Sequence, residues 1–134
     1  MADNKKGLAV FDLIARILLA LIFVFAALGK IADYHGTAMY MAAYGIPVSL
    51  LPLVIAVELL GGLAVIIGLW TRFAAWMLAA FSIVAIVIFH HTFATMSEQI
   101  IGLAEISFTG GLIGLAVNGP RCISVDAWMK KRSS

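Results

Sequence analysis

The chain has 134 residues, of which 63% are hydrophobic and 12% are charged, whereas soluble domains are about half apolar and a quarter charged. Polar residues are too few to coat a water-exposed surface, so the composition excludes a soluble protein and indicates one transmembrane domain over residues 1–134. A net charge of +2 without a glycine-rich phosphate loop predicts no nucleic-acid partner. The single cysteine, Cys122, excludes intrachain disulfides and thiolate metal clusters.

Four apolar runs of about 20 residues predict four membrane-spanning helices. They cover residues 8–29, 51–70, 73–91 and 100–117. Because the connections are short, successive helices must be antiparallel neighbours. The predicted fold is therefore an all-α integral membrane protein, a four-helix up-down bundle.

The nine Lys and Arg residues predict the orientation of the bundle. Lys30 alone falls at the end of the bundle opposite the termini, and the other eight fall at the end that holds the termini. An excess of Lys and Arg marks the cytoplasmic side of a membrane protein. Both termini and the tail over residues 119–134 are therefore predicted to be cytoplasmic. A cleaved signal peptide at the start of the chain is disfavoured because Asp12 and Arg16 interrupt the apolar run. The eight residues at the other end are Lys5, Lys6, Arg16, Arg72, Arg121, Lys130, Lys131 and Arg132.

Residues 34–49, between the first two spans, are too few to cross a bilayer but too apolar for a simple loop. Thr37 is suited to cap a short helix that ends at Gly45. Tyr40 and Tyr44 would share one face of that helix, since they are four residues apart. Two interpretations remain open: an anchor in the outer interface, or a lid over a site between the spanning helices.

Titratable residues from all four spans are expected to meet in one layer near the outer end. Glu58 lies about 10 Å in from the outer end of its helix, and Glu105, His90, His91 and Lys30 fall at a similar level. An acid at a helix centre costs about 2.5–3.5 kcal/mol on insertion. Glu58, His90, His91 and Glu105 are the candidates for a proton relay. The structural alternatives are a protonated Glu58 that holds helices together and a Lys30 that only reaches the interface.

A metal or haem site fits these residues less well. The Glu-x-x-His pairs of di-iron bundles are absent from the sequence. Haem ligation by two histidines would need His35 as the partner of His90 or His91. No metal site is therefore predicted.

Small residues and one charged pair suggest how the helices pack. Asp12 and Arg16 are four residues apart in the favourable order and are expected to set the depth of the first helix. Gly61 and Gly62 follow Glu58 by three and four residues, so all three share a helix face that a neighbouring backbone can approach.

The last span carries a GxxxG motif formed by Gly110 and Gly114. Such a motif favours close helix contact. It predicts a packing face within the bundle or between protomers of a homo-oligomer, with Glu105 on a different, polar face.

Several segments together resemble the DoxX family of small bacterial inner-membrane proteins. They are ARILLALIFVFAALGKI, GTAMYMAAYGIP, VELLGGLAVIIGLWTR, FHHTF and TGGLIGLAVNGP, followed by Ser124 and Asp126. The resemblance covers about residues 10–127. It implies a four-helix protein of the bacterial inner membrane that serves a quinone-linked or redox-stress complex.

The resemblance also maps family positions onto this chain. The matching residues are Arg16, Gly29-Lys30, Glu58 with Gly61 and Gly62, and His90 or His91. One departure is that relatives often have a Lys-Asn pair where this chain has Ala104 and Glu105. A lysine partner for Glu58 is therefore not expected from the last span, and two acids in one layer favour a shared proton.

The leading hypothesis is a membrane subunit that binds a quinone or another small apolar ligand near the periplasmic face. Lys30, Tyr40, Tyr44 and Glu58 are the candidate ligand-binding residues. A carboxyl–imidazole pair beside an apolar cleft suits the two protons that quinone reduction takes up. The chain has no evident electron carrier, so an enzyme would need a redox partner subunit. The alternatives are a non-enzymatic scaffold or assembly factor and, less favoured with only four helices, a proton-coupled transporter.

Overall fold

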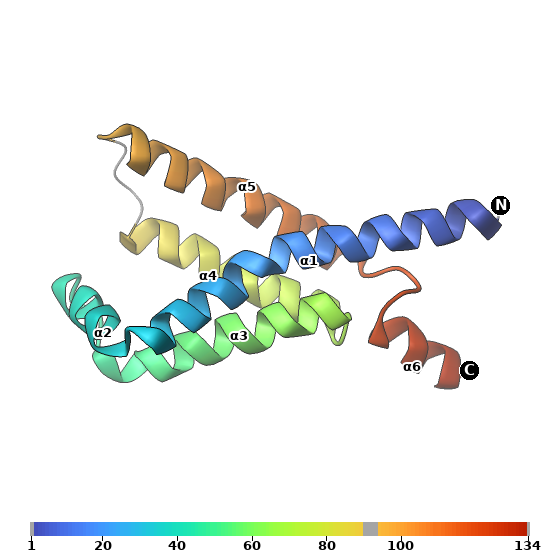
Figure 1. Cartoon of the computed structure of the whole chain (residues 1–134), viewed down its shortest axis with the longest axis horizontal. Helices are drawn as coiled ribbons and strands as arrows, with labels where there is room; N and C mark the ends of the chain where they lie inside the picture. The colour runs from blue at the N-terminus through green and yellow to red at the C-terminus, as the bar shows by residue number, and fades with distance from the viewer. Residues whose placement is uncertain (1, 90–93, 134) are drawn as a thin grey trace.

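The computed structural model describes residues 2–89 and 94–133, which form the helices drawn in Figure 1. His90 and His91 therefore lie outside the described residues. The elements in chain order are α1 (Ala2–Ala32), α2 (Tyr34–Ala43), the 3-10 helix η1 (Val48–Leu50), α3 (Leu51–Ile67), α4 (Thr71–Phe89), α5 (Met96–Asn118) and α6 (Val125–Ser133).

Within the described residues, four helical segments are long and apolar enough to cross a membrane. They are Lys5–Ala32, Val48–Ile67, Thr71–Phe89 and Met96–Asn118. The predicted all-α fold with four spanning helices is thus confirmed. The turn between the second and third spans lies at residues 68–70, however, rather than at residues 71–72, because Gly68 adopts a φ of +77° that ends α3.

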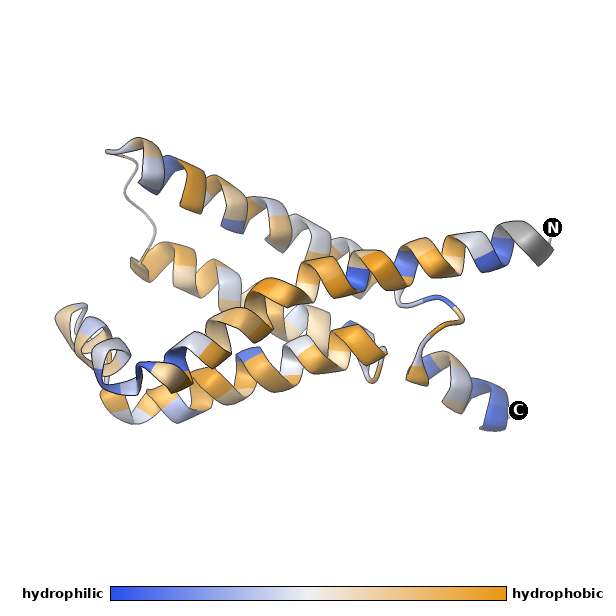
Figure 2. Cartoon of the chain, viewed as in Figure 1, coloured by the Kyte–Doolittle hydropathy of each residue, from blue (hydrophilic) through white to orange (hydrophobic). Residues whose placement is uncertain are grey.

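The spanning helices run alternately in opposite directions, and both ends of the chain lie at one end of the bundle (Figure 1). We call this the terminal end and the other, where α2 lies, the α2 end. Helix α3 packs against α1 and α4, α4 packs against α5, and α1 touches α5 over a short stretch. Figure 2 shows hydrophobic residues along the long helices and hydrophilic residues concentrated in α6 and near helix ends. The large apolar side chains that remain exposed, including Phe11, Leu18 and Phe25, form the surface that lipid covers.

Helix α2 occupies the predicted interfacial segment but begins earlier than expected. Asp33, not Thr37, is its N-cap: the Asp33 side chain accepts a hydrogen bond from the Gly36 N–H at 3.2 Å. The Thr37 hydroxyl donates to the Asp33 carbonyl at 2.9 Å. The carboxylate of Asp33 is the better acceptor for the free N–H groups of a first turn.

Gly61 and Gly62 face two different neighbours. A Cβ atom at Gly61 would lie 3.0 Å from Leu78 Cδ2 of α4. A Cβ atom at Gly62 would lie 2.9 Å from Val24 Cγ2 and 3.4 Å from the Ala20 carbonyl oxygen, both on α1. The two glycines therefore allow α3 to approach α4 on one side and the α1 backbone on the other.

The GxxxG motif of α5 does not pack inside the bundle. Of the two predicted roles for this motif, packing within the bundle is therefore wrong. Apart from the adjoining backbone of α5 itself, no atom of the described residues lies within 4 Å of a Cβ atom built at Gly110 or Gly114. The buried residues of α5 are instead Gly102, Thr109, Leu112 and Ala116. In lipid both faces of a helix are apolar, so small residues alone do not reveal which face meets the bundle.

A buried arginine joins three segments at the terminal end. Arg16 is 1% exposed, and it forms an ion pair with Asp12 in which Nε and Oδ2 are 2.9 Å apart. Its Nη1 donates to the carbonyls of Val65 (3.1 Å) and Ile66 (3.0 Å), and its Nη2 donates to the carbonyl of Ile123. Carbonyls in the last turn of a helix have no partner within it. Arg16 therefore caps α3 and ties it to α1 and to the segment before α6.

Asp126 caps the start of α4, as Arg16 caps the end of α3. Its carboxylate accepts hydrogen bonds from the N–H groups of Trp70 (2.7 Å) and Thr71 (2.8 Å), and its own N–H donates to the Gly68 carbonyl at 2.8 Å. Trp70 has a φ of 46°, which is uncommon for a residue other than glycine. A Cβ atom at Gly68 would lie 2.3 Å from Ser124 Cβ, so the turn needs glycine here. The C-terminal segment is thus fastened to the α3–α4 turn.

Candidate functional site

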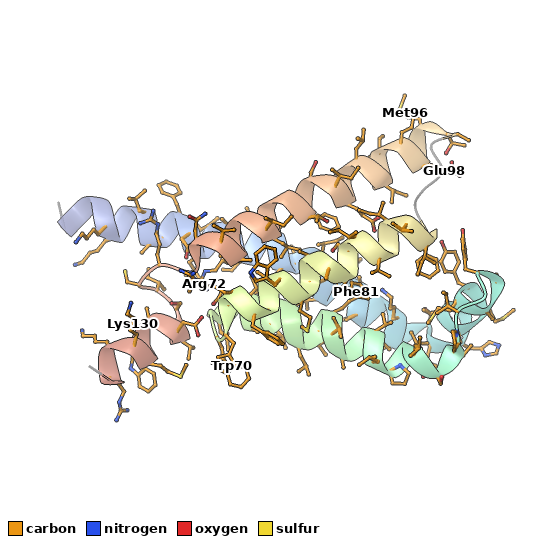
Figure 3. All side chains as sticks on the ribbon, turned by 180° about the vertical axis from the view of Figure 1, so that it is seen from behind. Trp70, Arg72, Phe81, Met96, Glu98 and Lys130 are labelled. Carbon is orange, nitrogen blue, oxygen red and sulfur yellow. The ribbon has the colours of Figure 1, made fainter. Side chains whose placement is uncertain are left out.

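A cavity of about 440 Å³ lies toward the α2 end, between the spanning helices and α2. Its walls are mostly apolar and include Phe81 of α4, which is labelled in Figure 3. Each spanning helix and α2 also contributes at least one polar residue to the lining. These residues are Lys30, Thr37, Tyr40, Glu58, Ser82 and Glu105.

An ion pair between Lys30 of α1 and Glu58 of α3 is the main polar feature of this lining. Lys30 Nζ lies 2.7 Å from Glu58 Oε1. The Glu58 side chain is 3% exposed and that of Lys30 is 26% exposed. The alternative in which Lys30 only reaches the interface is therefore wrong. As expected, the lysine partner of Glu58 does not come from the last span. The partner comes from the first span because the close approach of α1 to α3 at Gly62 sets their side chains face to face.

Glu58 keeps one acceptor atom unused. Within the described residues, its Oε2 is buried and has no hydrogen-bond partner. A buried carboxylate oxygen without a partner is rare and costly in a finished structure. Because Glu58 lines the cavity, a ligand that carries a hydrogen-bond donor would satisfy this atom.

Glu105 lines the same cavity from α5, on the face that also carries the buried Thr109. The Thr109 hydroxyl donates to the Glu105 carbonyl at 2.6 Å. Glu58 Oε1 accepts a hydrogen bond from Lys30, and Glu58 Oε2 has no hydrogen-bond partner among the described residues. The cavity thus contains a lysine–glutamate pair and a second carboxyl group on another wall, and a proton shared between the two acids stays a prediction.

Three aromatic rings connect α2 to the end of α4. The ring centroids of Tyr40 and Phe89 are 5.4 Å apart, those of Tyr44 and Phe89 are 4.9 Å apart, and those of Tyr40 and Tyr44 are 5.0 Å apart. Tyr40 and Phe89 also line the cavity. Helix α2 thus forms part of the cavity wall through Thr37, Tyr40 and Met41. Whether it acts as a lid or as an interfacial anchor stays a prediction.

Tyr40 is suited to donate rather than to accept a hydrogen bond. Burial raises the pKa of the Tyr40 phenol to about 12, with smaller contributions from Tyr44 and from the charge of Glu105. The phenol therefore stays protonated throughout the physiological pH range. Together, Tyr40, Lys30 and the Glu58 carboxylate give the cavity both donors and an acceptor.

The residues that sequence reasoning missed are the apolar ones that shape the cavity. Phe23 and Phe108 form an edge-to-face pair with centroids 5.5 Å apart, and both line the cavity. Nothing in an apolar run distinguishes such residues from those that face lipid. The described residues contain no group of three His, Cys, Asp or Glu side chains placed to hold a metal ion.

Comparison with known proteins identifies the family to which the chain belongs. The family model DoxX matches residues 11–91. The chain therefore belongs to the DoxX family and is an inner-membrane protein, as the resemblance predicted.

Relatives match over nearly the whole chain. The inner membrane protein YqjF of Escherichia coli (strain K12) is 39% identical over 128 residues, which cover 96% of this chain and 98% of the relative. The inner membrane protein YphA of the same organism is 34% identical, with 92% and 94% covered. A Bacillus subtilis (strain 168) protein named "Putative oxidoreductase CatD" is 28% identical, with 95% and 92% covered. No solved structure matches the chain.

Proposed function

We propose that this protein is the membrane subunit of a quinone-linked redox complex and that its cavity binds a quinone or a similar small apolar ring. The observation that carries the proposal is an apolar cavity of about 440 Å³ whose lining contains a partly buried ion pair and a Glu58 oxygen without a hydrogen-bond partner among the described residues. Small-molecule sites commonly have volumes of about 300–1,000 Å³ and a few convergent polar groups. The name of the CatD relative contains the word oxidoreductase, which supports a redox role.

The polar groups suit both oxidation states of such a ligand. The Lys30 ammonium and the Tyr40 hydroxyl are donors for a quinone carbonyl oxygen, and Glu58 Oε2 is an acceptor for a quinol hydroxyl. Reduction of a quinone adds two electrons and two protons and yields the quinol. The electrons would come from a partner subunit that carries a redox group, and the cavity residues would bind the ring and hold its hydroxyl proton.

The position of the cavity supports a site near the periplasmic face. It lies toward the α2 end, opposite the termini. Most Lys and Arg residues are at the terminal end, and an excess of positive charge favours the cytoplasm.

Replacing Glu58 with glutamine tests the proposal. The change keeps the shape of the side chain but removes its charge, so binding of a short-chain quinol should weaken about 10-fold or more. The dissociation constants of quinol and quinone would be measured for the purified protein in mild detergent. Glu98→Gln is a matched control because glutamine also completes the capping box that Thr95 and Glu98 form at the start of α5. Unchanged quinol affinity in Glu58→Gln, or no quinol binding to the native protein, would refute the proposal.

One observation favours a second function, that of a non-enzymatic scaffold. The open positions at Gly110 and Gly114 leave a surface of small residues on α5 that another membrane helix can approach. A scaffold predicts that Gly110→Leu abolishes association with a partner subunit while quinol affinity is unchanged. Cross-linking in native membranes would measure that association.

A further inference from the structure

A second hollow lies at the terminal end of the bundle, opposite the end where the cavity lies. It is a groove of about 700 Å³ between the start of α4 and the segment that leads into α6. Figure 3 labels three of its residues, Trp70, Arg72 and Lys130, and shows them at the end of the bundle where α6 lies.

The lining of the groove is strongly cationic. Arg72, Arg121 and Lys130 all contribute to it, and Asp126 is the acidic residue among the lining residues. Both carboxylate oxygens of Asp126 already accept hydrogen bonds from backbone N–H groups of the α3–α4 turn. The described lining therefore contains three cationic side chains and one carboxylate, and both oxygens of that carboxylate already accept backbone N–H groups. The net positive charge of this lining would attract an anion.

Arg72 is held in place by the backbone next to it. Its Nη2 donates to the Asn118 carbonyl at 3.3 Å, and its Nε lies 2.7 Å from where a Cβ atom of Gly119 would be. Gly119 has a φ of +74°, a conformation that favours glycine. A guanidinium positioned in this way keeps further N–H groups for an oxyanion.

Exposed aromatic side chains border the groove on the side of α4. Trp70 is 69% exposed and Phe73 is 67% exposed, and the third membrane-spanning segment begins at Thr71. Tryptophan gathers at the level of lipid headgroups, at the boundary between membrane and water. The groove therefore opens at headgroup depth, with apolar surface continuing along α4 at Trp76, which is 50% exposed.

We propose that this groove binds the phosphate headgroup of an anionic phospholipid of the bilayer. Arg72, Arg121 and Lys130 would neutralise the headgroup, and Phe73 and Trp76 would lie along the acyl chains. Basic pockets between helices at a membrane surface are a recognised form of lipid headgroup site. This binding is independent of the quinone proposal because the two hollows share none of the lining residues that the structure describes.

Native mass spectrometry of the purified protein in detergent tests the proposal, with phosphatidylglycerol or phosphatidylcholine added. The native protein should retain phosphatidylglycerol in preference to phosphatidylcholine. Removing two of the cations in the double variant Arg121→Gln/Lys130→Gln should weaken phosphatidylglycerol binding about 30-fold. The single variant Lys130→Gln, on the short and exposed helix α6, should weaken it about 5-fold and remains informative if the double variant does not fold.

The matched control is Lys5→Gln/Lys6→Gln, which removes the same charge from exposed positions on α1. It should leave phosphatidylglycerol binding unchanged. The proposal is overturned if this control loses as much affinity as the groove variants, because binding would then depend on total charge alone. It is also overturned if inorganic phosphate displaces the lipid, since the groove would then be a site for soluble anions.

Discussion

Replacing Lys30 with methionine removes the partner of a carboxylate that is almost completely buried. Lys30 Nζ lies 2.7 Å from Glu58 Oε1, and the Glu58 side chain is 3% exposed. Breaking a buried ion pair by removing one partner costs about 3–5 kcal/mol. Because the Lys30 side chain is 26% exposed, some water already reaches the pair, so we expect the lower end of that range, about 3 kcal/mol. Protonating an ordinary glutamate at pH 7 costs about 3.7 kcal/mol. This is the upper limit for the stability lost in Lys30→Met, because the unpaired Glu58 can take up a proton instead of staying charged.

The free energy of unfolding would be measured by SDS titration of the protein in detergent micelles. Lys30→Met should lose about 3 kcal/mol. The double variant Lys30→Met/Glu58→Gln should return to within about 1 kcal/mol of the native protein, because no unpaired charge remains. Lys6→Met, on the exposed start of the same helix, is the matched control and should change the free energy by less than about 0.5 kcal/mol. If Lys30→Met is as stable as this control, or the double variant is no more stable than Lys30→Met, the reasoning is wrong.

Three further outcomes follow from other contacts. Gly62→Val should destabilise the protein by about 1–3 kcal/mol in the same titration, because its side chain collides with α1, whereas Gly110→Ala should not. Asp126→Asn should cost about 1 kcal/mol and speed hydrogen exchange at the Thr71 amide; unchanged exchange would contradict the capping role. The absorbance difference between the native protein and Tyr40→Phe should show a phenol that ionises near pH 12. The stability that Tyr40 contributes should be complete below pH 10 and lost between pH 10 and pH 12.

The spanning helices could be predicted because lipid imposes a simple requirement. A helix of about 20 apolar residues satisfies its own backbone hydrogen bonds and suits the bilayer, whatever its neighbours are. The boundaries depend on local details, such as the positive φ of Gly68, and so they differ by a few residues.

The ion pair in the cavity could not be predicted, because it depends on which helices touch and in what rotation. Lys30 and Glu58 are 28 residues apart in sequence. Each alone has an ordinary explanation, a lysine at a helix end and an acid among glycines. Only the approach of α1 at Gly62 brings them together.

The role of Asp126 was hidden for a related reason. It lies in a polar tail, where an acidic residue is expected to face water, and its hydrogen-bond partner Trp70 is 56 residues away. The buried face of α5 was also ambiguous, since apolar periodicity separates core from water but not core from lipid.

The fastening of the C-terminal segment to the α3–α4 turn implies an order of assembly during synthesis. Residues 119–133 follow the four spans in the chain, so the contacts of Arg16 with the Ile123 carbonyl and of the start of α4 with the Asp126 carboxylate can form only after all four spans have been made. The contacts at the terminal end are therefore completed only after the spans have been synthesised, and a segment made after the fourth span secures the first three spans to one another.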